Sequence, residues 1–247
     1  MRHFTSEKGF AAILVVSLLP CLLAGLFLVA VLMSFMQTDL ELKHHCRSGG
    51  LSGQASVRPL LMSLLALNPV ATTLKIQETA VLAKLAVAVS SGNVPAITTL
   101  KAQLAKIRQK RQELDLRQKQ LIQQSNLLLA RNHGSTAFDI RSRAQNLKTQ
   151  FFFLNLSLRV LHEEAPRLAV HPDSSDVAPT YSPEESFETR QALAHRWQYR
   201  LTPRGPLAYF LAGSFQFDKA CAVTLTKDAR GWKTLITKGK YSLKSVW

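Results

Sequence analysis

Few residues in this chain combine the types and spacing that chemistry requires. His44 and His45 precede Cys46, and imidazole nitrogens together with a thiolate are the ligands that zinc prefers. A stable zinc site needs about four ligands, and no second histidine–cysteine cluster lies near these three in the sequence. The paired acids Glu163-Glu164 and Glu184-Glu185 flank a proline-rich stretch, where solvated carboxylates are expected. We therefore predict no metal site.

Nucleophilic catalysis has no sequence support either. Serine, histidine and aspartate are all present, but no nucleophile elbow or other placed arrangement joins them. The chain also carries no recognisable cofactor motif. We predict that it is not an enzyme and that it takes no cofactor.

Positive charge is concentrated in one part of the chain. The formal net charge is +15 at pH 7, and residues 97–150 hold eleven Lys or Arg against three acidic residues. A basic face of this kind binds phosphates, anionic lipid headgroups or acidic polymers, and the alternative is a solvated helix face. Nucleic acid is a partner that the charge permits, although no base-reading motif supports it. The candidates for anion binding are Lys101, Lys106, Arg108, Lys110, Arg111, Arg117 and Lys119.

The longest feature of the sequence is an apolar stretch near the N-terminus. Residues 10–36 are 27 residues without a charge, and a helix of that size is about 40 Å long, more than the roughly 30 Å hydrocarbon core of a bilayer. A secretory signal has an apolar region of only about 7–15 residues. We therefore expect a retained transmembrane helix over 10–36, with a kink at Pro20.

Orientation follows from the tail that precedes this stretch. Residues 1–9 carry Arg2 and Lys8 against Glu7, and a short, slightly basic tail stays in the cytoplasm while long following domains are exported. We expect a single-pass protein of a bacterial inner membrane. Its N-terminus would be cytoplasmic and its C-terminal domain periplasmic or extracellular.

The three cysteines fall on both sides of this boundary. Cys21 lies in the apolar stretch, whereas Cys46 and Cys221 lie on the exported side, where an oxidising compartment permits a disulfide. The spacing alone does not bring the latter two within reach. A Cys46–Cys221 bond, two free thiols and an intermolecular link all stay open.

The N-terminal segment KGFAAILVVSLLP resembles the start of pilin-like proteins, and it is most similar to the TadE/TadG-like components of Tad (Flp) pilus machinery. The shared features are Lys8-Gly9 before the apolar run and Pro20 within it. The resemblance implies a single span followed by an extracytoplasmic domain. In processed members it also implies cleavage after Gly9, which would leave Phe10 as the new N-terminus. Typical prepilins have Glu five residues after the cut, where this chain has Leu14, so an unprocessed anchor stays open beside a processed one.

Helical patterns follow the apolar stretch. Glycines within 49–53 are expected to interrupt or bend the helix that leaves the membrane. Residues 54–69 predict a short helix that ends at Asn68-Pro69, because the residue before proline disfavours helical geometry. Residues 71–93 predict a second helix, and Pro95 suits the first turn of a third.

The third helix carries the clearest periodicity. Five apolar residues fall seven apart, namely Leu100, Ile107, Leu114, Leu121 and Leu128. The companion positions are less apolar, namely Leu104, Arg111, Gln118 and Ser125. A two-stranded coiled coil needs both sets apolar, so packing within the chain is favoured over a partner-binding coiled coil. His133-Gly134 is expected to end this helix, and a fourth, from about 135 to 164, is expected to bury the segment FFFLNLSLRVL.

Beyond this point the composition changes. Residues 165–186 contain four prolines with serines and acids, which predicts a loop. Alternation of apolar and polar residues then predicts strands around 197–201, 215–227, 232–238 and 241–247, with turns at 228–231 and 238–240.

These patterns predict an α+β protein of five parts. They are a tail (1–9), a transmembrane helix (10–36), an extracytoplasmic helical hairpin or bundle (37–164), a Pro/Ser-rich loop (165–186) and an antiparallel β region (187–247). The expected role is a structural or assembly component of a cell-envelope machine, such as a Tad-type pilus or related secretion system. Its expected partners are the membrane and other envelope or pilus-assembly proteins. The alternative is a membrane protein whose basic exported domain binds an anionic polymer, such as DNA, lipid headgroups or surface polysaccharide.

Overall fold

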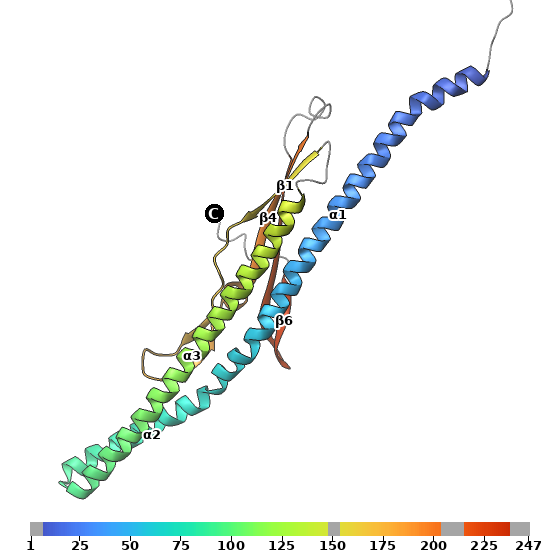
Figure 1. The fold of residues 1–247 in the computed structure, drawn as a ribbon. Helices are drawn as coiled ribbons and strands as arrows, with labels where there is room; N and C mark the ends of the chain where they lie inside the picture. Colours follow the sequence, from blue (N-terminus) through green and yellow to red (C-terminus); the bar gives the residue numbers. More distant parts are fainter. Residues whose placement is uncertain (1–6, 148–153, 204–214, 238–247) are drawn as a thin grey trace, which may run out of the picture.

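The structure is a computed structural model, and residues 7–147, 154–203 and 215–237 are described. It is helix-rich, with a small antiparallel sheet in the C-terminal part, so the predicted α+β class is confirmed (Figure 1). The helices are α1 (Glu7–Ala66), α2 (Asn68–Ser90), α3 (Val94–Leu147) and the short α4 (Phe187–Arg190). The strands are β1 (Leu154–Leu161), β2 (Val170–Pro172), β3 (Tyr181–Pro183), β4 (Leu193–Pro203), β5 (Phe215–Asp228) and β6 (Gly231–Thr237).

Helix α1 is one continuous helix of 60 residues. The prediction of an interruption at the glycines and of a separate helix over 54–69 is therefore wrong. Gly50 and Gly53 are buried because α1 meets other elements there, and that packing outweighs the low helix propensity of glycine. The predicted end before Pro69 is confirmed within two residues, since α1 stops at Ala66 and Pro69 lies in the first turn of α2.

Helices α2 and α3 form an antiparallel hairpin at one end of the molecule (Figure 1). The turn between them uses Gly92 at φ +66°, a conformation that favours glycine. The side chain of Asn93 then caps α3 by accepting a hydrogen bond from the Ala96 amide at 3.2 Å. Both the helix end at 90–93 and the new start near Pro95 agree with the sequence pattern.

The heptad row of α3 packs within the chain. Leu114 is buried against Ala71 and Leu74 of α2, with Ile107 at the edge of the same cluster. Farther along α3, Leu121 and Leu128 pack on a core formed with α1 and the sheet. The row thus first faces α2 and then faces α1.

Helix α3 does not end where the sequence indicates. It runs through His133 and Gly134 to Leu147, so the predicted end and the separate fourth helix are both wrong. A Cβ added at Gly134 would meet nothing within 4 Å, which means that this glycine occupies an open helix surface rather than a cap.

The segment predicted to complete that fourth helix is a strand from Leu154 onward. Leu156 and Leu158 are buried while Arg159 is exposed, and this alternation of period two is that of a strand with one covered face. The density of apolar residues in the segment conceals the alternation. Residues 151–153 lie outside the described residues.

The main sheet has the order β1-β4-β5-β6 with every neighbouring pair antiparallel. Trp197 and Tyr199 of β4 are fully buried, as their alternation with polar residues predicts. The turn between β5 and β6 spans Asp228 to Gly231, where Gly231 has φ +111°, and it agrees with the predicted turn at 228–231. The predicted turn at 238–240 and strand at 241–247 lie outside the described residues.

Residues 165–186 are more ordered than the loop that their composition predicts. Strands β2 and β3 form a two-stranded antiparallel sheet within them. The Asn68 side chain fixes β3 to the start of α2, because it donates to the Tyr181 carbonyl at 2.7 Å and accepts from the Tyr181 amide at 2.9 Å.

Candidate functional site

The N-terminal part of α1 projects beyond the rest of the molecule (Figure 1). Nearly all the described side chains from Val15 to Met33 are exposed, and most of them are large and apolar. In the described part of the chain, α1 is the one helix long and apolar enough to cross a membrane. It is compatible with a single-pass membrane protein. The predicted span, 10–36, lies entirely within it.

The residues named for prepilin-type processing lie at the very start of this helix. α1 begins at Glu7, so Lys8, Gly9 and Phe10 belong to its first turn. First-turn amides have no partner within the helix, and helix ends fray easily. Cleavage after Gly9 stays a prediction.

Below the projecting part, α1 is covalently joined to the sheet. Cys46 of α1 and Cys221 of β5 form a disulfide, with Cα atoms 6.4 Å apart, across 175 residues of sequence. Both cysteines are buried in a cluster with Trp197 and Tyr199. Of the alternatives left open by the sequence, the intramolecular bond is the one that the structure contains.

The region around the Cys46–Cys221 disulfide, where α1 meets α3 and the sheet, is called the joint below. Three glycines let α1 approach its neighbours closely there. A Cβ at Gly49 would lie 2.5 Å from the Thr136 hydroxyl of α3, and one at Gly50 would lie 2.7 Å from a Val223 methyl of β5. A Cβ at Gly53 would meet Leu193 of β4 at 2.6 Å. These glycines serve as contact points between α1 and both α3 and the sheet.

Buried polar groups extend the joint in both directions. The Gln54 amide donates to the Gln191 carbonyl at 2.7 Å, and Gln191 in turn accepts from the Ala169 amide. Nearer the apolar segment, the Asp39 carboxylate accepts from the Tyr199 hydroxyl and pairs with Lys43. Burial and the neighbouring Asp39 raise the pKa of Tyr199, so its hydroxyl stays a donor.

The seven basic candidates of α3 divide into two groups. Arg108 and Arg111 both pair with Glu78 of α2, and Lys119 pairs with Asp115. The hydrogen bond from Arg111 lowers the pKa of Glu78, which keeps that carboxylate charged. The remaining four are exposed and make no ion pair in the described ranges, namely Lys101, Lys106, Lys110 and Arg117.

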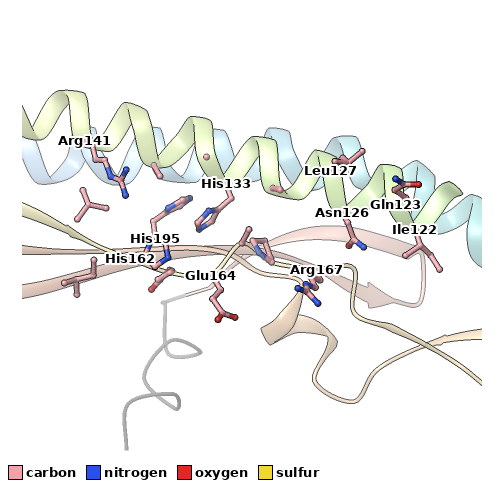
Figure 2. Close-up of a pocket in the computed structure, with 18 of the residues that line it drawn as sticks. Ile122, Gln123, Asn126, Leu127, His133, Arg141, His162, Glu164, Arg167 and His195 are labelled. Atoms are coloured by element: carbon pink, nitrogen blue, oxygen red, sulfur yellow. The ribbon is translucent and has the colours of Figure 1, made fainter. Parts of the chain in front are cut away.

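A groove of about 920 Å³ lies between α3 and the segment that follows β1. Figure 2 shows His133 of α3 and His195 of β4 side by side between the helix and the sheet. Their rings are stacked, with centroids 4.5 Å apart. The Nε2 atoms of both histidines, and both carboxyl oxygens of Glu163, are buried without a hydrogen-bond partner among the described residues.

Burial sets the protonation of these groups. It lowers the pKa of His195 to about 3, with His133 contributing, and it also lowers the pKa of His133. Burial raises the pKa of Glu163. The two imidazoles are therefore neutral near pH 7 and can accept hydrogen bonds. The groove lining contains no serine, threonine or cysteine among the described residues, so it supplies no side-chain hydroxyl or thiol nucleophile.

The described ranges contain no group of three or more His, Cys, Asp and Glu that could hold a metal ion. Cys46 is engaged in the disulfide, so it cannot act as a thiolate ligand beside His44 and His45.

Sequence reasoning missed the stacked histidines, although one signal pointed to His195. It shares the inward phase of Trp197 and Tyr199 on β4, which places it in the core. His133 carried no comparable signal, because it was assigned to a helix end. The pairing of the two depends on α3 continuing past Gly134.

Comparison with known proteins adds no relative. No protein-family model, no curated protein and no solved structure matches the chain.

Proposed function

We propose that this protein is a single-pass membrane component of a cell-envelope assembly, of the pilin-like or TadE/TadG-like kind. Residues 10–36 of α1 cross the inner membrane, and residues beyond about 37 form a head on the far side. The head serves as a structural part rather than as a catalyst.

One observation carries the proposal: the exposed apolar segment and the head share one unbroken helix. α1 passes from the exposed run 15–33 into the buried joint at Cys46 without a break. Such a helix holds the head in a fixed direction relative to the span, whereas a simple anchor needs only a flexible linker. Exposed apolar surface of this extent marks a membrane or association surface.

Site-specific photo-cross-linking in the native host tests the assembly. A photoreactive residue at Leu23, on the exposed part of α1, is expected to cross-link to a discrete envelope protein. The matched control places the photoreactive residue at Val89, which is as exposed as Leu23 but lies on the distant α2. A chain that resists alkaline extraction yet gives only lipid adducts at Leu23 would contradict the assembly role and leave a simple anchor.

The Gly9→Leu variant separates the processed from the unprocessed form. A pilin-like subunit would lose a nine-residue leader in the wild type. In the variant, both this cleavage and assembly would be blocked. Unchanged mass and unchanged assembly in both would support a TadG-like, unprocessed anchor.

The four exposed candidates of α3 that make no ion pair in the described ranges favour a second function, which is capture of an anionic polymer. Replacing Lys101, Lys106, Lys110 and Arg117 with glutamine should abolish retention on duplex DNA at low salt if this function exists. Unchanged retention of the quadruple variant on DNA would contradict polymer capture by these four side chains.

A further inference from the structure

We propose that the end of the sheet nearest the apolar segment rests on the lipid surface, with Phe215 and Phe217 in the headgroup layer beside α1. The proposal rests on the membrane anchoring proposed above. It adds a second point of contact between the head and the bilayer, and its partner is the lipid surface itself.

The first step is the level at which the sheet meets α1. Phe35 packs edge-on against Tyr199 of β4 with ring centroids 5.0 Å apart. The ring centroid of Phe217 lies 6.5 Å from that of Phe35. One turn farther along α1, Asp39 bonds the Tyr199 hydroxyl at 3.2 Å. The paired residues Tyr199 and Phe217 are therefore level with Phe35.

The second step is the direction of β5 relative to α1. Val223 lies against Gly50, Cys221 is bonded to Cys46, and Phe217 lies near Phe35. Strand and helix thus run parallel, side by side, as Figure 1 also shows. Phe215 lies two residues beyond Phe217, which is about 7 Å of strand, or four to five residues of helix. It is consequently level with about residue 31 of α1.

The third step is the depth of that level in a bilayer. About 20 helical residues cross the hydrocarbon core, so a span that starts at Phe10 leaves the hydrocarbon near residue 30. The apolar run continues to Met36, and its surplus residues 31–35 fall in the headgroup layer, which is about 5–8 Å thick on each side. The surplus residues of α1 are those beside Phe215 and Phe217.

The fourth step is the chemistry of the sheet end. Phe215 and Phe217 share the phase of the buried Cys221 and Val223, yet they are 53% and 45% exposed. Exposed Met36 on α1 lies at the same level and adds to the apolar surface. Aromatic and aliphatic side chains on one face are what a protein buries at the boundary between headgroups and acyl chains. The lipid surface would cover the part of this inward-phase pair that α1 leaves exposed.

Spin-label accessibility in vesicles tests the proposal. Single cysteines replace Phe215, Phe217, Lys227 and Leu26 in the full chain carrying Cys21→Ser, with the Cys46–Cys221 disulfide left oxidised. The labelled chains are reconstituted in phosphatidylcholine vesicles, and collision with oxygen is compared with collision with a water-soluble nickel chelate. Lys227 is the matched control, because it is exposed at the opposite end of the same strand.

We expect the oxygen-to-nickel ratio at positions 215 and 217 to exceed that at 227 several-fold and to fall below that at 26. Equal ratios at 215, 217 and 227, with a lipid-exposed label at 26, would overturn the contact while leaving the anchor intact. Water exposure at 26 as well would instead show that the anchor itself fails. Protection from both probes at 215 and 217 would indicate contact with a second copy and would also overturn the proposal. Melting of each labelled chain verifies that the head is folded.

Discussion

At the scale of single residues, Gly50 and Gly134 make a matched pair within long helices. A Cβ at Gly50 would lie 2.7 Å from the Val223 side chain, whereas one at Gly134 would meet nothing within 4 Å. Gly50→Ala is therefore expected to destabilise the fold by about 1–3 kcal/mol through overpacking. Gly134→Ala is expected to stabilise it by roughly 0.5–1 kcal/mol, because alanine favours the helix. Chemical unfolding of the two variants in detergent checks both signs, and destabilisation by Gly134→Ala would contradict the open helix surface at that position.

The histidine pair predicts how stability depends on pH. The folded-state pKa of His195 is about 3, below the usual value of about 6.5, so between these values the unfolded chain binds the additional proton. Stability is consequently lost as pH falls through about 6.5, by at most roughly 1.4 kcal/mol per pH unit for each such histidine. His133 acts in the same direction. Glu163, whose pKa is raised by burial, acts in the opposite direction, because the folded chain binds the additional proton.

Thermal melting at pH 7.5 and 5.5 measures this loss. The His195→Phe variant keeps a ring stacked on His133 but has no proton to bind, so its midpoint should fall less between the two pH values than that of the wild type. His44→Phe, at an exposed position of α1, is the matched control. Equal slopes in the wild type and in His195→Phe would show that His195 is not buried in its neutral form.

At the scale of elements, the hairpin of α2 and α3 is held by charge as well as by apolar packing. Glu78 of α2 receives both Arg108 and Arg111, and the side chains of Glu78 and Arg111 are 12% and 13% exposed. Glu78→Ala should cost about 1–3 kcal/mol, because it leaves a largely buried guanidinium without its carboxylate partner, with the Val177 carbonyl as a remaining acceptor. A double-mutant cycle with Arg111→Met measures the coupling. The exposed pair Lys75–Asp176 should couple by less than about 1 kcal/mol, and equal coupling in the two pairs would contradict the role of burial.

Some elements follow from local pattern, and others depend on what packs against them. The turn at 90–93 and the inward Trp197 and Tyr199 follow from residue types that act alone. The glycines within 49–53 predict an interruption of the helix. Only their contacts with α3 and the sheet explain why α1 continues through them. The apolar residues of segment 154–161 would suit a buried helix as well as a buried strand. Its pairing with β4 decides that it is a strand. The stacking of His133 on His195 also depends on packing, because α3 must continue for His133 to reach His195.

At the scale of the whole molecule, one disulfide links α1 to the sheet across most of the chain. Its closed loop of 175 residues corresponds to about 5 kcal/mol in the chain-entropy model. Reduction, or the double variant Cys46→Ser with Cys221→Ser, should therefore lower the melting midpoint of the head clearly. Cys21→Ser should leave it unchanged, because Cys21 is exposed and outside the bond. A midpoint insensitive to reduction would mean that packing alone holds α1 on the sheet.

The central claim for the whole molecule is that the apolar run of α1, residues 10–36, is retained as the anchor and is continuous with the part of α1 that packs in the head. The most direct test is the intact, non-reduced mass of the protein extracted from its native membrane. We predict a chain that begins at Met1 or at Phe10 and that weighs two hydrogens less than its fully reduced form. A chain shortened past the apolar run and recovered in the soluble fraction would contradict this claim.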